Sequence, residues 1–257
     1  MKVVVLCGGK GTRISEETEI LPKPMVEIGN KPILWHIMKI FSSYGYNDFV
    51  LCLGYKGYII KEYFSHYFLH MSDVTINMAN NEIEIHTTTS EPWKVTLIDT
   101  GSETMTGGRL KRIEKYVEGK TFIMTYGDGV GDVNIPKLVK SHENRKKIAT
   151  LTAIQTAGRF GLLDIDKKSN INSFLEKPKT EGTWINAGFF ILEPQVFNYI
   201  EGNSTTWERE PLENLAKDGQ LNAYKHNGFW MCMDTLRDKI ELEKIWQSGK
   251  VPWKVWK

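Results

Sequence analysis

The feature that most constrains the fold of this chain is an apolar run near its beginning that ends in a glycine-rich segment. Residues 3 to 6 are consecutive aliphatic residues, and glycine follows at positions 8, 9 and 11. An unbroken run of this kind is typical of a parallel strand that is buried on both faces. Glycine permits a tight loop whose main-chain N–H groups can be approached closely. We therefore predict a buried first strand that leads into a phosphate-sized loop.

The segments after this loop alternate between helices and strands. Apolar residues recur at helical spacing from Ile33 to Tyr44 and again from Ile59 to Phe68. Further buried strands are predicted at residues 49–53, 95–99, 121–126, 149–154 and 184–192. Two alternating stretches, residues 74–78 and 82–86, indicate a small antiparallel excursion. The whole pattern predicts an α/β fold with a Rossmann-like, doubly wound mixed sheet.

Three local signals predict helix boundaries. Asn30 is a candidate N-cap for the first periodic segment, and Gly45 follows that segment. Thr205 and Glu208 have the spacing of a capping box, so a helix is expected to begin there. Asp234 precedes a charged helical segment from about residue 236 to residue 247.

Composition and charge limit the class of protein. We find no internal repeat and no Pro-, Gly- or Ser-rich linker, so residues 1–257 are expected to form one domain. The formal net charge of +2 is too small for the broad basic face of a duplex nucleic-acid binder, so no nucleic-acid partner is expected. Cys7, Cys52 and Cys232 lie in apolar segments, which favours reduced, buried thiols rather than a disulfide framework. No apolar run suits a signal peptide or a membrane span, so we expect a cytoplasmic protein without a membrane partner.

Two basic residues accompany the glycine-rich loop. Arg13 ends the segment, and Lys23 follows ten residues later between two prolines. Such cations neutralise charge that develops on a leaving pyrophosphate, while main-chain N–H groups bind phosphate oxygens. A dinucleotide fingerprint would require a third glycine at Ile14, and a P-loop would require lysine at Thr12. A triphosphate site is therefore predicted, with an ordinary loop turn as the alternative.

Further short motifs follow in a fixed order along the chain. They are Tyr126-Gly127-Asp128, Glu176-Lys177-Pro178, Asn186-Ala187-Gly188 and the segment from Trp230 to Asp234. Together with the glycine loop and the Pro-Lys-Pro segment, they resemble the motifs of the sugar-phosphate nucleotidyltransferase family over nearly the whole chain. The resemblance implies a fold of the nucleotide-diphospho-sugar transferase type. Within it, residues 1–130 would mainly bind the nucleotide, and residues 131–257 would mainly bind the sugar phosphate and support oligomerisation.

The same resemblance implies roles for individual residues. The implied nucleotide-binding residues are Leu6, Cys7, Gly8, Gly9, Lys10, Gly11, Thr12, Arg13, Lys23, Thr104, Arg109 and Gly127. The implied catalytic residues are Arg13, Lys23, Asp128 and Lys177. The implied sugar-phosphate-binding residues are Tyr126, Glu176, Lys177 and Asn186. The implied Mg²⁺ ligands are Asp128 and Asp234. Carboxylate and phosphate oxygens are the ligands that this cation prefers.

The choice of substrates also follows from the resemblance. Residues 31–38, 99–101, 106–110 and 229–230 are similar to those of family members that join CTP to glucose 1-phosphate, giving CDP-glucose and pyrophosphate. Such a product implies a role in forming bacterial deoxysugars for surface polysaccharide, including the O-antigen of lipopolysaccharide. UTP, dTTP or ATP remain alternative nucleotides, and a non-catalytic nucleotide-sugar sensor remains an alternative function. Ile14-Ser15-Glu16-Glu17 departs from the Leu and Pro that are usual after the Thr-Arg pair.

Several of these residues also fit a purely structural interpretation. Asp128 suits a turn or a helix cap, and Lys177 suits a solvated surface charge. Arg109 suits an exposed basic surface, since Lys111 and Arg112 follow it. Both interpretations of Arg109 remain open from the sequence.

Two other groups of residues bear on metals and on assembly. The six histidines lack the paired spacing of a zinc site, so we expect them to be structural or surface residues. Aromatic residues recur from Tyr58 to Phe68, and tryptophans occur near the end of the sequence. Such aromatics are more often part of a core or a subunit interface than of a ligand groove. We favour the interface, and therefore expect a homo-oligomer.

Overall fold

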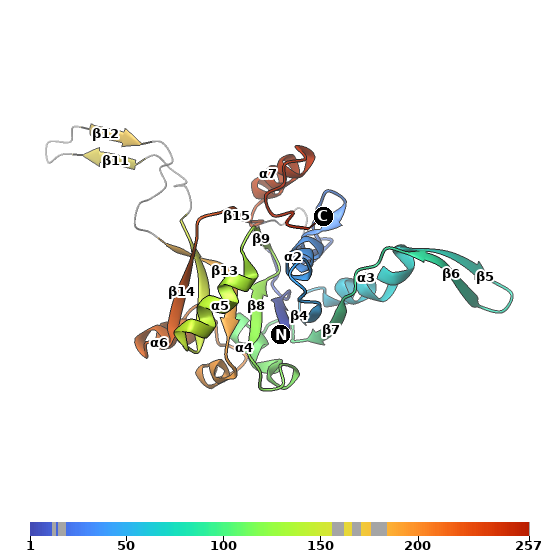
Figure 1. Ribbon diagram of the computed structural model, residues 1–257, viewed down its shortest axis with the longest axis horizontal. Helices are drawn as coiled ribbons and strands as arrows, with labels where there is room; N and C mark the ends of the chain where they lie inside the picture. Colours follow the sequence, from blue (N-terminus) through green and yellow to red (C-terminus); the bar gives the residue numbers. More distant parts are fainter. Residues whose placement is uncertain (12–13, 15–18, 156–161, 166–170, 176–183, 257) are drawn as a thin grey trace.

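A seven-stranded sheet forms the centre of the molecule (Figure 1). A computed structural model describes residues 1–11, 14, 19–155, 162–165, 171–175 and 184–256. The strand order across the sheet is β14-β10-β13-β8-β1-β4-β7. These strands are β1 (Val3–Leu6), β4 (Asp48–Leu53), β7 (Lys94–Asp99), β8 (Phe122–Tyr126), β10 (Ala149–Ile154), β13 (Ile185–Leu192) and β14 (Leu221–His226). The predicted strands are confirmed to within two residues at each end.

Strand β13 runs against the other six strands of this sheet. β1 pairs in parallel with β4 and β8, whereas β13 pairs in antiparallel fashion with β8 and β10. Because Thr125 lies opposite Phe189, the end of β8 and the beginning of β13 reach the same edge of the sheet. The carboxyl ends of β1, β4 and β7 lie at this edge too. Polar groups that follow these strands therefore converge, as is usual for open α/β sheets.

Helices cover both faces of the sheet, which confirms the doubly wound α/β prediction. Val3 and Val5 of β1 pack in one core with α2 (Ile33–Ser42), α3 (Gly57–His70), α5 (Ile135–Arg145) and α7 (Leu236–Gln247). Val4 and Leu6 point to the opposite core, which contains α4 (Thr106–Arg112), the short helix η4 (Pro194–Tyr199) and α6 (Glu210–Lys217). Side chains alternate between the two faces of a strand, so an unbroken apolar run serves both cores.

Shorter elements decorate this core. The two-stranded ribbons of the described chain are β2 (Glu27–Ile28) with β3 (Lys31–Pro32), β5 (Ser72–Asn77) with β6 (Glu82–Thr88), β9 (Gly129–Gly131) with β15 (Trp230–Cys232), and β11 (Leu162–Ile165) with β12 (Ile171–Leu175). The remaining short helices are η2 (Lys23–Met25) and η3 (Glu114–Tyr116). The β5–β6 ribbon extends away from the body (Figure 1), which confirms the predicted antiparallel excursion.

Two predicted helix boundaries are wrong. Asn30 does not cap α2, whose N-cap is Pro32. Asn30 instead has a φ of 61° between β2 and β3, and asparagine tolerates this left-handed backbone in turns. The predicted capping box at Thr205 and Glu208 is absent, because α6 begins at Glu210 and the Glu208 side chain contacts other elements. In both cases a tertiary or turn contact outweighed the local capping signal.

The three cysteines are free, as predicted. Cys7 and Cys52 are buried, and Cys232 is partly exposed. Burial raises the pKa of the Cys7 thiol well above its ordinary value. No helix in the part of the chain that the structure describes has the length and apolar character needed to cross a bilayer.

His36 of α2 packs against α7 and the segment that follows α7. Its Nε2 lies 2.8 Å from the Ile28 carbonyl oxygen, and the Trp253 indole N–H donates to its Nδ1 at 3.5 Å. Rings of Trp246 and Trp256 pack against the imidazole with centroids 4.7 and 6.2 Å away. Burial lowers the pKa of His36 to about 4, because an imidazolium here would lose its hydration. These contacts hold α7 and the residues that follow it against α2.

We predict that this histidine makes stability depend on pH. Between pH 6.5 and pH 4 the unfolded chain binds a proton that the folded chain excludes, so the free energy of unfolding falls as pH falls through this window. The loss attributable to His36 should approach about 3 kcal/mol at the acid end. Denaturant unfolding of the wild-type chain and of His36→Gln at pH 7 and pH 5 checks this. Equal pH slopes for the two proteins would contradict the assignment.

Candidate active site

A cavity of about 520 Å³ opens at the edge of the sheet where the carboxyl ends of β1 and β8 meet. Its wall combines main chain from the glycine-rich loop with charged side chains from segments far apart in the sequence. The lining residues are Leu6, Cys7, Gly8, Gly9, Gly11, Lys23, Pro24, Thr104, Met105, Thr106, Arg109, Tyr126, Gly127, Asp128, Glu208 and Asp234. Most of the predicted nucleotide site is therefore gathered in one place.

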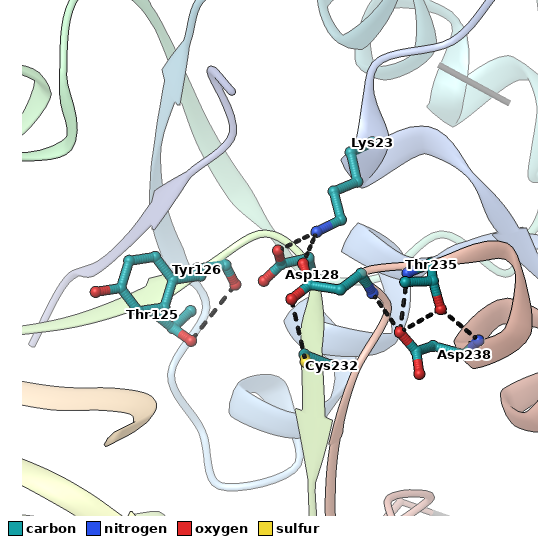
Figure 2. Close-up of polar contacts among 8 residues, drawn as sticks. Lys23, Thr125, Tyr126, Asp128, Cys232, Thr235 and Asp238 are labelled. Carbon is teal, nitrogen blue, oxygen red and sulfur yellow. Dashed lines mark hydrogen bonds and ion pairs between the residues drawn. The ribbon is translucent and has the colours of Figure 1, made fainter. Parts of the chain in front are cut away.

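Lys23 bridges the two predicted metal ligands, Asp128 and Asp234. Figure 2 shows its ammonium group directed at Asp128. Its ammonium nitrogen lies 2.6 Å from Oδ2 of Asp128 and 2.6 Å from Oδ1 of Asp234. Burial by itself would lower the pKa of Lys23, but the charges of the two carboxylates and the hydrogen bonds to them raise it above its ordinary value. The three side chains are largely shielded from solvent, with exposed fractions of 13%, 28% and 19%. Lys23 is consequently held as a cation.

The β9–β15 ribbon places the two carboxylates side by side. Gly129 pairs with Cys232, so Asp128 directly precedes one strand of the ribbon and Asp234 follows the other after one residue. The Met233 N–H donates to the Asp128 carbonyl oxygen at 2.8 Å. On the far side, the Asp234 N–H donates to the Asp238 carboxylate, which forms a capping box with Thr235 at the start of α7. The main chain at both aspartates is thus held by hydrogen bonds.

Arg109 ties together the main chain at the ends of three parallel strands. One guanidinium nitrogen donates to the Leu53 and Gly101 carbonyl oxygens at 3.1 and 2.7 Å and to the Thr100 hydroxyl at 2.8 Å. The other donates to the Gly8 carbonyl oxygen at 2.9 Å. Burial lowers the pKa of Arg109. Since this side chain is buried, the alternative of an exposed basic surface at Arg109 is wrong.

Two glycines leave room for that guanidinium. A Cβ atom built on Gly8 or on Gly54 would overlap Arg109, and a Cβ on Gly54 would also lie 2.7 Å from the Gly8 carbonyl oxygen. Gly8 is therefore required by the arginine as well as by any ligand that approaches the loop. By contrast, a Cβ on Gly9 would meet no atom within 4 Å.

A chain of hydrogen bonds forms the opposite wall. The Tyr126 hydroxyl donates to the Glu208 carboxylate at 2.5 Å, and the Thr106 hydroxyl donates to the same carboxylate at 2.6 Å. Burial first, and then the charge of Glu208, raises the pKa of Tyr126. Asn186, at the beginning of β13, also hydrogen-bonds Tyr126 and accepts from the Gly188 N–H at 2.8 Å. Glu208, Thr106 and Met105 line the cavity without having been predicted, and only the misinterpreted capping-box signal drew attention to Glu208.

The predicted site residues divide into three groups. The cavity wall contains Leu6, Cys7, Gly8, Gly9, Gly11, Lys23, Thr104, Arg109, Tyr126, Gly127, Asp128 and Asp234. Lys10 forms an ion pair with Glu103 at 2.9 Å, and Asn186 contacts the wall through Tyr126. Thr12, Arg13, Glu176 and Lys177 lie outside the described residues, so their roles remain predictions.

The two aspartates form a donor set that suits a divalent cation. Both carboxylates already share one positively charged group, and hard cations such as Mg²⁺ need only one or two protein carboxylates in addition to substrate phosphates. No cluster of three or more His, Cys, Asp or Glu side chains suited to a metal occurs among the described residues. The arrangement therefore fits a cation shared with a ligand rather than a cage made of protein alone.

A family model described as nucleotidyl transferase matches residues 2–244. The chain belongs to the nucleotidyl transferase family. It is 58% identical over 257 residues to a glucose-1-phosphate cytidylyltransferase of Salmonella typhimurium, with complete coverage of both chains. The predicted membership of a nucleotidyltransferase family is confirmed.

Two solved structures share the fold. The structure of HddC from Yersinia pseudotuberculosis complexed with GMP-PN has a TM-score of 0.67 and 25% identity, covering 95% of this chain and 99% of that one. UDP-glucose pyrophosphorylase complexed with UDP-glucose has a TM-score of 0.69 at 16% identity, covering 97% and 99%. These likenesses confirm the predicted nucleotide-diphospho-sugar transferase type of fold.

We predict that Gly54→Ala will disturb the part of the cavity that Arg109 and Gly8 form. The added methyl group must displace the buried guanidinium or the Gly8 main chain, and overpacking of this kind costs about 1–3 kcal/mol. Chemical denaturation measures the loss of stability. Gly202→Ala is the matched control, because its Cβ meets nothing within 4 Å, and it should change stability by less than about 0.5 kcal/mol. Equal effects of the two substitutions would contradict the role given to Arg109.

Proposed function

We propose that this chain is a Mg²⁺-dependent glucose-1-phosphate cytidylyltransferase. It would transfer the cytidylyl group of CTP to α-D-glucose 1-phosphate and release pyrophosphate. The observation that carries the proposal is the convergence of Lys23, Asp128 and Asp234 beside the glycine-rich loop in one cavity. The cytidylyltransferase named above, 58% identical over the whole length, supports the choice of substrates.

The reaction requires positioning and charge neutralisation rather than a covalent protein intermediate. A phosphate oxygen of glucose 1-phosphate attacks the α-phosphorus of CTP, and the bond from that phosphorus to the pyrophosphate oxygen breaks. Main chain at Gly8, Gly9 and Gly11 binds the β- and γ-phosphates. Lys23 donates to the α-phosphate, where negative charge develops during the displacement. No activated serine, cysteine or histidine is needed.

Asp128 and Asp234 would hold the Mg²⁺ ion. When bound, this ion neutralises phosphate charge and helps to orient the triphosphate. The proposal also includes Arg13 at the β- and γ-phosphates, Lys177 at the phosphate of the sugar, and Glu176 with Asn186 at the sugar hydroxyls. Residues 1–130 accordingly supply most of the nucleotide site, and residues 131–257 supply most of the acceptor site.

Cellular context forms a further part of the proposal. The free cysteines suit the cytosol, where thiols stay reduced. The β5–β6 ribbon leaves about half of Ile76, Ile83 and Ile85 exposed on one face, and an uncovered apolar face of this kind supports assembly with further copies of the chain. CDP-glucose from this reaction would enter the synthesis of deoxysugars for bacterial surface polysaccharide, including O-antigen.

A pyrophosphate-release assay tests the function. CTP, UTP, dTTP and ATP are each supplied with glucose 1-phosphate and Mg²⁺, and CTP is expected to give the highest kcat/KM. Preference for another nucleotide would favour the alternative of the same chemistry on a different base. Absence of pyrophosphate with all four nucleotides, together with nucleotide binding by calorimetry, would favour a non-catalytic sensor and overturn the proposal.

Substitutions assign the effect to the cavity. Asp128→Asn and Lys23→Ala should each lower kcat by about 10²–10³-fold, a loss typical of a removed transition-state contact. Asp132→Asn is the matched control, because Asp132 pairs with His226 at 2.9 Å and does not line the cavity. Circular dichroism confirms that each variant is folded. Turnover of Lys23→Ala near the wild-type rate would refute the role of this lysine.

A further inference from the structure

One ammonium group is shared by both metal-binding carboxylates. The Lys23 nitrogen lies 2.6 Å from an oxygen of Asp128 and 2.6 Å from an oxygen of Asp234. It therefore occupies the space between the two oxygens, close to both. The ammonium group and a metal ion would therefore compete for the same two carboxylates.

Lys23 and a divalent cation cannot share that space. Mg²⁺ binds carboxylate oxygens at about 2.0–2.1 Å. A cation that bridges Oδ2 of Asp128 and Oδ1 of Asp234 would therefore lie where the ammonium now sits. Two positive charges at such a separation also repel strongly where water is largely excluded. Contact of these two oxygens with the ammonium and their coordination to a metal are mutually exclusive.

The lysine can leave this space without movement of its main chain. Pro22 and Pro24 flank Lys23 in η2, and Pro24 packs close to Gly127, so the segment is anchored. The carboxylates are anchored too, by the Met233 N–H on one side and by the capping box of α7 on the other. Rotation of the flexible four-carbon stem is the movement that remains.

A triphosphate offers the lysine a new partner. The cavity that contains Lys23 also contains the main chain of Gly8, Gly9 and Gly11. An ammonium group removed from two carboxylates loses its charge partners, and this is costly in a shielded site. An anionic ligand at the glycine loop replaces those partners. Departure of the lysine is therefore favoured when metal and triphosphate bind together and disfavoured when the metal binds alone.

We propose that Lys23 is an internal counter-ion that a divalent cation displaces onto the triphosphate, so that metal binding and nucleotide binding are coupled through one side chain. The inference rests on the proposed function for the identity of the two ligands. The coupling is reciprocal: a nucleotide that draws Lys23 away exposes the carboxylates, and a metal that expels Lys23 strengthens the nucleotide site. The same lysine then contacts the α-phosphate more strongly when the metal is also bound than when the nucleotide is bound alone.

Binding of Mn²⁺ without nucleotide tests the exchange apart from activity. Free Mn²⁺ is followed by electron paramagnetic resonance during titration of the full chain. Lys23→Met removes the competing ammonium and should bind Mn²⁺ about 5- to 150-fold more tightly than the wild-type chain, the range typical of coupled sites. Adding Asp128→Asn to Lys23→Met should abolish the tight site, which identifies the carboxylates as the ligands.

A matched charge control separates competition from general electrostatics. Lys10→Met also removes one positive charge near the loop, but Lys10 pairs with Glu103 rather than with the two aspartates. It should leave Mn²⁺ affinity within about twofold of the wild-type value, since exposed charges interact weakly through solvent. Equal tightening by Lys10→Met and Lys23→Met, or no tightening by Lys23→Met, would overturn the proposal.

A measurement on the wild-type chain remains decisive if Lys23→Met does not fold. Nitrogen-15 NMR of labelled lysine ammonium groups, with Mg²⁺ added in the absence of nucleotide, should shift the Lys23 signal and leave that of Lys10 in place. An unmoved Lys23 signal at Mg²⁺ saturation would contradict displacement. A chain that turns over CTP yet shows neither effect keeps its proposed function and loses only the exchange, so the two failures are distinguishable.

Discussion

The buried guanidinium of Arg109 is the interaction on which the shape of the cavity depends. Parallel strands end with carbonyl groups at a common edge, and such groups need partners when they are shielded from water. Arg109 supplies donors to carbonyl oxygens beyond β1, β4 and β7 at once, and no carboxylate pairs with it in the described residues. Arg109 thus holds the glycine-rich loop in place before any ligand binds. The guanidinium leaves no room for a Cβ atom at positions 8 and 54, so glycine is required at both.

A second constraint fixes the positions of the two carboxylates in the cavity. Asp128 and Asp234 are distant in sequence, and the β9–β15 ribbon brings their main chains together. The position of Asp234 depends in turn on α7, whose capping box fixes its start and whose far end packs through Trp246 onto His36. The position of Asp234 in the cavity is therefore supported by packing at the other end of α7, away from the reacting groups.

Periodicity and motif spacing predicted the parts of this molecule that short stretches of chain determine. The apolar run of β1, the strand at residues 149–154 and the helix at residues 236–247 were all located, because burial on two faces or one stripe leaves a local pattern. The cations that accompany the glycine-rich loop pointed to Lys23, and the resemblance to a known family pointed to Asp128 and Asp234. The contacts of Arg109 and Glu208 were missed, since each joins elements far apart in the chain and leaves no spacing signal. Asn30 was misassigned because one residue type serves both helix caps and left-handed turns.

The contact between His36 and Trp253 has a consequence for synthesis of the chain on the ribosome. The two residues are 217 positions apart. The ribosome therefore adds Trp253, whose indole covers the imidazole, long after it has made α2, the helix that contains His36. At usual elongation speeds of about 5–20 residues per second, the apolar face of α2 waits for about 10 to 40 s before its last covering residues emerge. During that interval nascent chains are open to mutual association or to capture by chaperones, and the apolar face of α2 is covered once Trp253 has been added.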